Sequence, residues 1–235
     1  MRKSLFVVMA ATGLFAGNAI AQDAAYGNFY VGFGVGKTNL KTSVTFDGTG
    51  VDAFKFDDDA SSVSGILGYT FNPYLSVEGA FAFTGRAKAS ETKSGGVNSI
   101  TMDNESDMRS LEVVAKGTLP LGKFELFARG GVVFADVDSE IKINAYNGTA
   151  MTNVPSKITA SYQDGGFLLG AGAGYNFGRG QIRLQYDYYG TEVKGTNDQN
   201  LTLPNDDNTF TKLTGPVTIE TKDTSRLMLS FTGYF

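Results

Sequence analysis

Apolar residues alternate with polar or small residues through eight stretches of this chain. The apolar positions of these stretches begin at Phe29, Val63, Leu75, Leu111, Phe124, Phe167, Ile182 and Leu227. A period of two is typical of β-strands, because successive side chains of a strand point to opposite faces of the sheet. The pattern therefore predicts an all-β protein with eight strands.

The connections between these stretches alternate between short and long. The short ones are 72–73, 120–123 and 178–180, and the long ones cover about 37–62, 89–107, 136–165 and 191–225. The short ones carry the Pro, Gly and Asn residues that favour tight turns. In an antiparallel up-and-down order, all long connections fall at the same end. This asymmetry predicts a transmembrane β-barrel with short periplasmic turns and four long extracellular loops.

The charged residues of the predicted strands fall on the phase opposite to the apolar one, with Arg109 as an exception near a loop end. A charge facing lipid at mid-bilayer costs about 2–4 kcal/mol, so the charged phase is expected to face the lumen. The predicted lumenal charge network consists of Glu78, Arg86, Lys88, Glu112, Lys116, Glu125, Arg129, Arg183 and Asp187. Arg226 shares this phase. Because side chains fill an eight-stranded barrel, paired charges predict a plug that stabilises it.

The first residues have the features of a secretory signal. Arg2 and Lys3 precede an apolar run from Leu5 to Phe15, and Ala19-Ile20-Ala21 has the small residues of a cleavage site. The run is too short to cross a bilayer as a helix. We therefore expect residues 1–21 to be a cleaved signal peptide and residues 22–235 to form the barrel domain.

Composition excludes several kinds of chemistry. The 235 residues include no Cys and no His, which excludes disulfides, thiolate or histidine metal sites and His-dependent catalysis. A net charge of −4 argues against nucleic acid as a partner. The glycines of 32–36 and 170–174 lack the spacing of a phosphate-binding or dinucleotide-binding loop, so no cofactor is expected. They are interpreted instead as residues that line the barrel interior or relieve crowding on bent strands.

Asp57, Asp58 and Asp59 lack the alternating spacing of a calcium-binding loop. They are interpreted as a solvated acidic loop, with no metal site expected; loose bridging to lipopolysaccharide through divalent ions is the alternative.

The chain ends on an aromatic residue in strand phase. The terminal apolar positions are Leu227, Leu229, Phe231, Gly233 and Phe235. Here the sequence resembles the small outer-membrane β-barrel family of Gram-negative bacteria, which includes outer membrane protein A and X barrels and opacity-type porin-family proteins. The resemblance implies that these five positions form the β-signal read by the outer-membrane assembly machinery. It also implies an outer-membrane monomer among lipid and lipopolysaccharide.

Three functions follow from this interpretation. The favoured one is a structural and surface-interaction role, in which loops with 19 acids and 9 bases contact a host or phage ligand. The aromatic anchors expected in these loops are Phe46, Phe54, Phe56, Tyr146, Tyr162 and Phe210. The alternative is a narrow porin-like channel for small solutes, since lumenal ion pairs in the family are thought to rearrange. An outer-membrane enzyme is the least favoured.

Overall fold

The computed structural model describes residues 28–46, 53–95, 98–147, 150–204 and 210–235. The expected signal peptide, residues 1–21, lies outside these described residues. Within them, no helix is long and apolar enough to cross a membrane.

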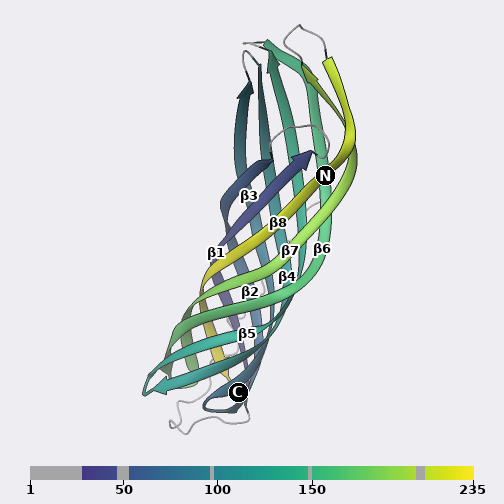
Figure 1. The fold of residues 1–235 in the computed structure, drawn as a ribbon. Helices are drawn as coiled ribbons and strands as arrows, with labels where there is room; N and C mark the ends of the chain where they lie inside the picture. Colours follow the sequence, from purple (N-terminus) through teal and green to yellow (C-terminus); the bar gives the residue numbers. More distant parts are fainter. Residues whose placement is uncertain (1–27, 47–52, 96–97, 148–149, 205–209) are drawn as a thin grey trace.

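Eight antiparallel strands close into a barrel in sequence order (Figure 1). The strands are β1 (Asn28–Phe46), β2 (Phe54–Asn72), β3 (Leu75–Gly95), β4 (Asn98–Leu121), β5 (Phe124–Asn147), β6 (Ala150–Phe177), β7 (Gly180–Pro204) and β8 (Phe210–Tyr234). The ring closes where β1 pairs with β8, for example Phe33 with Phe231. Closure satisfies the backbone of every strand at membrane depth. The predicted fold class is confirmed.

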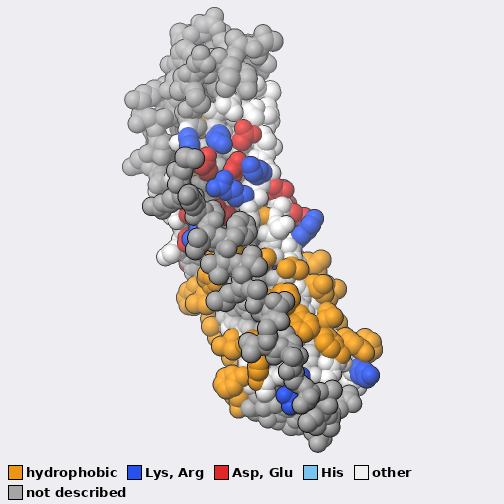
Figure 2. Space-filling view, turned by 180° about the vertical axis from the view of Figure 1, so that it is seen from behind, with side chains coloured by type: hydrophobic (Ala, Val, Ile, Leu, Met, Phe, Trp, Pro, Cys, Tyr) orange, Lys and Arg blue, Asp and Glu red, His pale blue; other side chains and the backbone are white. Residues whose placement is uncertain are grey.

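Exposed apolar side chains on all eight strands form a belt around the barrel. Figure 2 shows one face of this belt in orange, in the lower half of the molecule. Its side chains are the expected outward phase and remain about half exposed, for example Phe29, Leu67 and Leu184 at 59, 56 and 53%. On most strands the belt spans the 9–11 residues that a tilted strand needs to cross a bilayer. Aromatic rings pair along its lower margin, including Phe124 with Tyr175 at 5.1 Å between centroids.

Above the belt, the structure differs from the prediction of four long loops. The segments 37–62, 89–107, 136–165 and 191–225 are largely strand, and they extend the wall of the barrel. Above the belt the outer face meets water, so the apolar residues move to the inward phase, as in Leu40, Val44 and Phe46 of β1. The prediction that these segments are loops was therefore wrong. The alternation continues in them, but with the apolar side chains on the inner face of the barrel.

The upper barrel separates into two four-stranded sheets. Among the residues that the structure describes, pairing of β2 with β3 ends at Ser62–Thr84, and pairing of β6 with β7 ends at Phe167–Gly190. All other neighbours stay paired beyond these levels, which leaves the sheets β7-β8-β1-β2 and β3-β4-β5-β6. We call this two-sheet region the upper sandwich.

A packed apolar cluster lies between the two sheets. Its members are Val44, Phe46, Phe54, Phe56, Met102, Ile141, Ile143, Ile158, Ala160, Val217 and Ile219, each at most 5% exposed. Phe46, Phe54 and Phe56 are therefore core residues, and the expectation that they are exposed anchors is wrong. Tyr162 packs partly buried against this cluster, whereas the side chains of Tyr146 and Phe210 lie outside the described residues.

Side chains close the seam between β2 and β3. The Asp58 carboxylate accepts the backbone N–H of Lys88, and the Glu91 carboxylate accepts the backbone N–H of Lys55, both at 2.5 Å. Lys93 donates to the carbonyl oxygen of Ala53 at 2.6 Å. These bonds replace the missing ladder between the two strands.

The three aspartates of this region lie on strand β2, so the loop interpretation was wrong. The Asn39 amide donates to Asp57 at 2.6 Å and to Asp59 at 3.2 Å. Together with the role of Asp58 at the seam, these bonds give each carboxylate a protein partner.

Candidate functional site

The lumen at the level of the belt contains a balanced set of buried charges. Among the described residues, the buried acids are Glu78, Glu112, Glu125 and Asp187, and the buried bases are Lys116, Arg129, Arg183 and Arg226. Four negative and four positive charges compensate one another, as burial of ionised groups requires. We call these eight residues the lumenal plug.

Glu78 of β3 forms the lower part of the plug. It pairs with Arg183 of β7 and lies 3.8 Å from the ammonium of Lys116. The Tyr30 hydroxyl donates to it at 2.6 Å. Lys116 also pairs with Glu125 at 3.4 Å. Because β3 and β7 lie on opposite sides of the ring, the pair of Glu78 with Arg183 joins the two sides.

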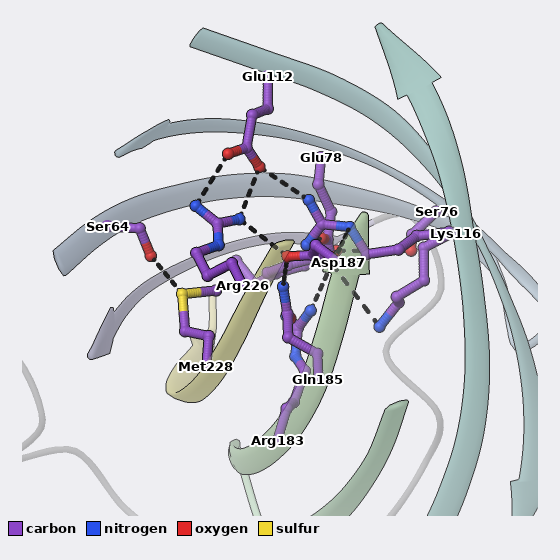
Figure 3. Close-up of polar contacts among 12 residues, drawn as sticks. Ser64, Ser76, Glu78, Glu112, Lys116, Arg183, Gln185, Asp187, Arg226 and Met228 are labelled. Atoms are coloured by element: carbon purple, nitrogen blue, oxygen red, sulfur yellow. Dashed lines mark hydrogen bonds and ion pairs between the residues drawn. The ribbon is translucent and has the colours of Figure 1, made fainter. Parts of the chain in front are cut away.

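Glu112 of β4 forms the upper part (Figure 3). It pairs with Arg226 at 2.9 Å, and the Tyr189 hydroxyl donates to it at 2.8 Å. Arg226 also donates to Asp187 at 2.9 Å, and Asp187 accepts from the Gln185 amide at 2.8 Å. This part therefore ties β8 and β7 to β4 across the lumen.

Arg129 of β5 connects the two parts. Its guanidinium lies 3.0 Å from Glu112, 3.5 Å from Glu78 and 3.5 Å from Asp187. The planar guanidinium of arginine has five N–H donors in fixed directions, and this geometry lets Arg129 face three carboxylates at once. Arg129 is thus the centre of the plug, and its contact with Glu78 is direct although another strand separates β3 from β5.

Glycines of β6 make room for the plug. A Cβ added at Gly170 would lie 2.3 Å from an oxygen of Asp187 and 3.0 Å from Cγ of Arg129. At Gly174 it would lie 2.9 Å from Cγ of Glu125. The glycine run of β6 lines the interior, as its sequence predicts, and its missing side chains provide space for the large ones opposite.

The centre of the plug is dry. Glu78, Glu112, Arg183 and Asp187 are 0% exposed, so no water-sized space adjoins them from either end or from within. Opening a path would require these ion pairs to separate and rearrange.

Two residues of the predicted network lie outside the lumen. Arg86 and Lys88 are exposed on the outer wall, where they pair with Glu105 at 3.4 and 3.0 Å. The register of β3 with β4 shifts between Thr84 and Ala87, and this bulge turns the following side chains to the other face. Ala87 then points inward, so the prediction for Arg86 and Lys88 is wrong. The other seven residues of the prediction are buried in the lumen.

Three further residues of the site were missed by sequence reasoning. Arg226 had the correct phase but was not counted with the network, because it stands at the start of the apolar part of its strand. Tyr30 and Tyr189 look like further aromatic residues of a strand, yet both are 0% exposed and donate to plug carboxylates. Their inward phase, read against the charged positions of the other strands, is the signal that could have found them.

Comparisons with known proteins agree with this architecture. The profile of the family described as the outer membrane protein beta-barrel domain matches residues 7–213. The chain belongs to this family. It is accordingly an outer-membrane protein, as predicted.

The similar structures include the outer membrane protein OprG from Pseudomonas aeruginosa, with a TM-score of 0.55 and 12% identity over 89% of this chain and 96% of that one. The attachment invasion locus protein Ail of Yersinia pestis matches with a TM-score of 0.39 and 17% identity, over 89% and 99%. At these identities the likeness to OprG shows the fold alone.

A sequence relative is an uncharacterized protein of Coxiella burnetii, 27% identical over 125 residues. The match covers 47% of this chain and 50% of that protein. The chain therefore spans about half the length of the curated relative that it matches.

Proposed function

We propose that this protein is a non-enzymatic surface protein of the outer membrane that uses its upper sandwich to contact ligands outside the cell. The observation that carries the proposal is the apolar core between the two sheets above the belt. Core residues such as Phe54 and Ile141 are 0% exposed. The packed core holds the outer wall of this region beyond the apolar belt.

The closed lumen supports the same proposal. A diffusion channel needs a continuous wet path, yet the plug is dry at Glu78 and Glu112, and apolar side chains fill the barrel above it. The outer wall is instead rich in exposed charge, including Arg86, Lys88 and Lys157. Figure 2 shows charged side chains of both signs gathered above the apolar belt on the face in view. A charged surface of this kind favours ligands of complementary charge.

The test removes the sandwich while keeping the belt and the plug. Residues 41–57, 89–104, 138–161 and 193–221 are each replaced by a two-residue Asn-Gly turn, because each pair of ends lies opposite in the ladder. Adhesion of cells to host matrix, phage adsorption and binding of serum factors are then compared with the intact protein. We expect folding and insertion to remain and ligand binding to be lost.

Conductance of the intact protein in planar bilayers tests the alternative function, a narrow channel. If the trimmed barrel keeps every surface phenotype, or if the intact barrel conducts small solutes steadily, the proposal is wrong. The narrow channel is then the better description.

A further inference from the structure

A groove of about 530 Å³ lies on the outer wall at the upper margin of the apolar belt, where it crosses β3 to β6. Its lower row is apolar, because Phe81, Leu111 and Phe134 lie opposite one another in the register and stay about half exposed. The row ends at Gly165 of β6, where the missing side chain leaves it open. A volume of this size is in the range of sites for small ligands.

The row above is polar and carries more acid than base. Arg109, Asp136 and Gln163 lie opposite one another on β4, β5 and β6, and all three line the groove together with Asp164. The guanidinium of Arg109 already lies 3.6 Å from the carboxylate of Asp138. The lining therefore has a net negative charge.

The negative charge continues directly above the groove. Asp107 of β4 lies opposite Asp138 of β5 in the ladder. Burial, the charge of Asp138 and that of Asp136 raise the pKa of Asp107 above its ordinary value, and Arg109 and Arg86 offset this effect only in part. A carboxyl group whose pKa is raised by its neighbours lies in a negative potential, which attracts cations.

The two carboxylates of the lining can accept further hydrogen bonds. Ser161 donates to one oxygen of Asp136 at 3.5 Å, and the backbone N–H of Gly165 donates to one oxygen of Asp164 at 2.7 Å. An ionised carboxylate has about four acceptor positions on its two oxygens. Each of the two therefore retains acceptor positions for a donor on a ligand.

We propose that this groove binds a small amphiphilic amine, a molecule that carries one ammonium group on an apolar body. The body lies along Phe81, Leu111 and Phe134, and the ammonium donates hydrogen bonds to Asp136 and Asp164. Charge complementarity selects a cation over an anion of the same shape. The two rows lie one above the other at the margin of the belt, so they match the apolar and charged ends of such a molecule.

The inference does not depend on the function proposed above. The trimmed barrel described there lacks residues 41–57, 89–104, 138–161 and 193–221. All residues that line the groove remain in it. Loss of surface binding in that variant and loss of amine binding in the variants below are therefore separate results.

Three probes with the same tail test the selection of charge. Dodecylammonium, dodecanol and dodecyl sulfate are each titrated, below solubilising concentrations, into phosphatidylcholine nanodiscs that contain the protein. NMR follows the backbone amides of residues 109–111 and 134–136. We expect dodecylammonium to saturate these shifts, and the neutral and anionic probes to bind at least threefold more weakly.

Two charge variants should act in opposite directions. Asp136→Asn removes an acceptor and a negative charge, so we expect it to weaken dodecylammonium binding about fivefold, the upper range for an ion pair at an exposed surface. Arg109→Gln removes the base from the lining and releases Asp138 from its pair. It should therefore strengthen dodecylammonium binding by a similar factor.

A third variant and a matched control test the groove itself. Gly165→Leu fills the groove, and its Cβ would meet the Phe134 ring at 3.5 Å, an ordinary contact. It should weaken dodecylammonium binding at least fivefold. Gly117→Leu adds the same side chain to the opposite end of the belt, where nothing lies within 4 Å of the new Cβ, and it should leave binding unchanged.

Circular dichroism and the boiling-dependent gel shift first establish that each variant is folded. Equal binding of the three probes, or tighter binding of dodecyl sulfate, would overturn the proposal. Unchanged dodecylammonium binding in the Asp136→Asn and Arg109→Gln variants would overturn it too. So would an equal loss in the Gly165→Leu and Gly117→Leu variants, because that result describes unspecific contact of the probe with the belt.

Discussion

At the scale of single residues, the plug depends on matched charges rather than on any one strong pair. Arg129 contacts Glu78, Glu112 and Asp187, so its removal leaves three buried carboxylates under-compensated. Burial makes this costly, because an unpaired charge in a dry interior cannot recover its hydration.

We expect Arg129→Ala to lower the free energy of unfolding by about 3–5 kcal/mol, the range found when one partner of a buried ion pair is removed. Arg129→Lys should recover part of the loss, since it restores the charge without the fork. Urea unfolding followed by circular dichroism measures both variants. Lys142→Ala, an exposed residue of the same strand, is the control and should change little. Wild-type stability of the Arg129→Ala variant would contradict the role given to the plug.

The outer wall provides a second residue-scale prediction. The hydrogen bond from Lys88 holds the pKa of Glu105 below its ordinary value, with Lys142 and Arg86 adding to the effect. A lowered pKa means that this carboxylate stabilises the fold above its unfolded pKa and that the contribution is lost as pH falls through the folded pKa. NMR titration should show Glu105 ionising below free glutamate, and Lys88→Met should raise its pKa. An unchanged pKa of Glu105 in the variant would contradict the effect assigned to Lys88.

At the scale of elements, the alternation of apolar and polar side chains predicted the fold more accurately than the lengths of the connections did. The eight strands, their order and the inward position of seven network residues follow from the phase of the belt segments, because lipid penalises each exception. Arg86 and Lys88 were misplaced because one bulge exchanges the faces of a strand. A bulge depends on local backbone geometry and leaves no fixed residue pattern, so counting along the chain cannot detect it.

The strands above the belt could not be recognised for a related reason. Outside the membrane the selection for an apolar outer face ends, and the apolar phase changes sides, as between Phe33 and Leu40 of β1. Interspersed threonines such as Thr38 and Thr42 further weaken the signal. Which strands separate at the two seams depends on pairing partners, and this information is not local in sequence.

The glycines of β6 yield an element-scale prediction. Gly170→Ala should destabilise the barrel by about 1–3 kcal/mol, the usual cost of overpacking, because its Cβ would clash with Asp187. Gly130→Ala on the neighbouring strand should be tolerated, since its Cβ meets the Leu169 side chain at 3.5 Å. Thermal unfolding in detergent compares the two. Equal destabilisation by the two substitutions would mean that position 170 requires glycine for its backbone freedom and not for the space that it leaves to the plug.

The last strand, β8, yields a second prediction at the scale of elements. Phe235 is 55% exposed on the belt, and its backbone N–H donates to the carbonyl of Phe29 at 3.0 Å, beside the closure of the ring. If Leu227, Leu229, Phe231, Gly233 and Phe235 act as the assembly signal, deleting Phe235 should lower the outer-membrane amount and raise periplasmic degradation. Cell fractionation measures this. Normal insertion of the shortened chain in cells with intact assembly machinery would contradict the role of Phe235 in the assembly signal.

At the scale of the whole molecule, the barrel has two regions stabilised in different ways. The lower one is closed by a complete ladder and an ion-pair plug, and the upper one is held by an apolar core between two sheets. The seams at Ser62–Thr84 and Phe167–Gly190 mark the boundary between them. Fewer backbone hydrogen bonds cross the upper region, so we expect it to open locally at lower free energy.

This division predicts that damage to the upper core stays above the boundary. Ile141 of β5 is 0% exposed within the apolar cluster, and Ile141→Ala should cost about 2–5 kcal/mol there. Hydrogen exchange should therefore accelerate in the strand segments above the seams, while amides of the belt keep their protection. Val132→Ala on the same strand removes a belt side chain that is 49% exposed, and it should leave the upper amides unchanged. Uniform acceleration along every strand of the Ile141→Ala variant would show that barrel and sandwich unfold as one cooperative unit.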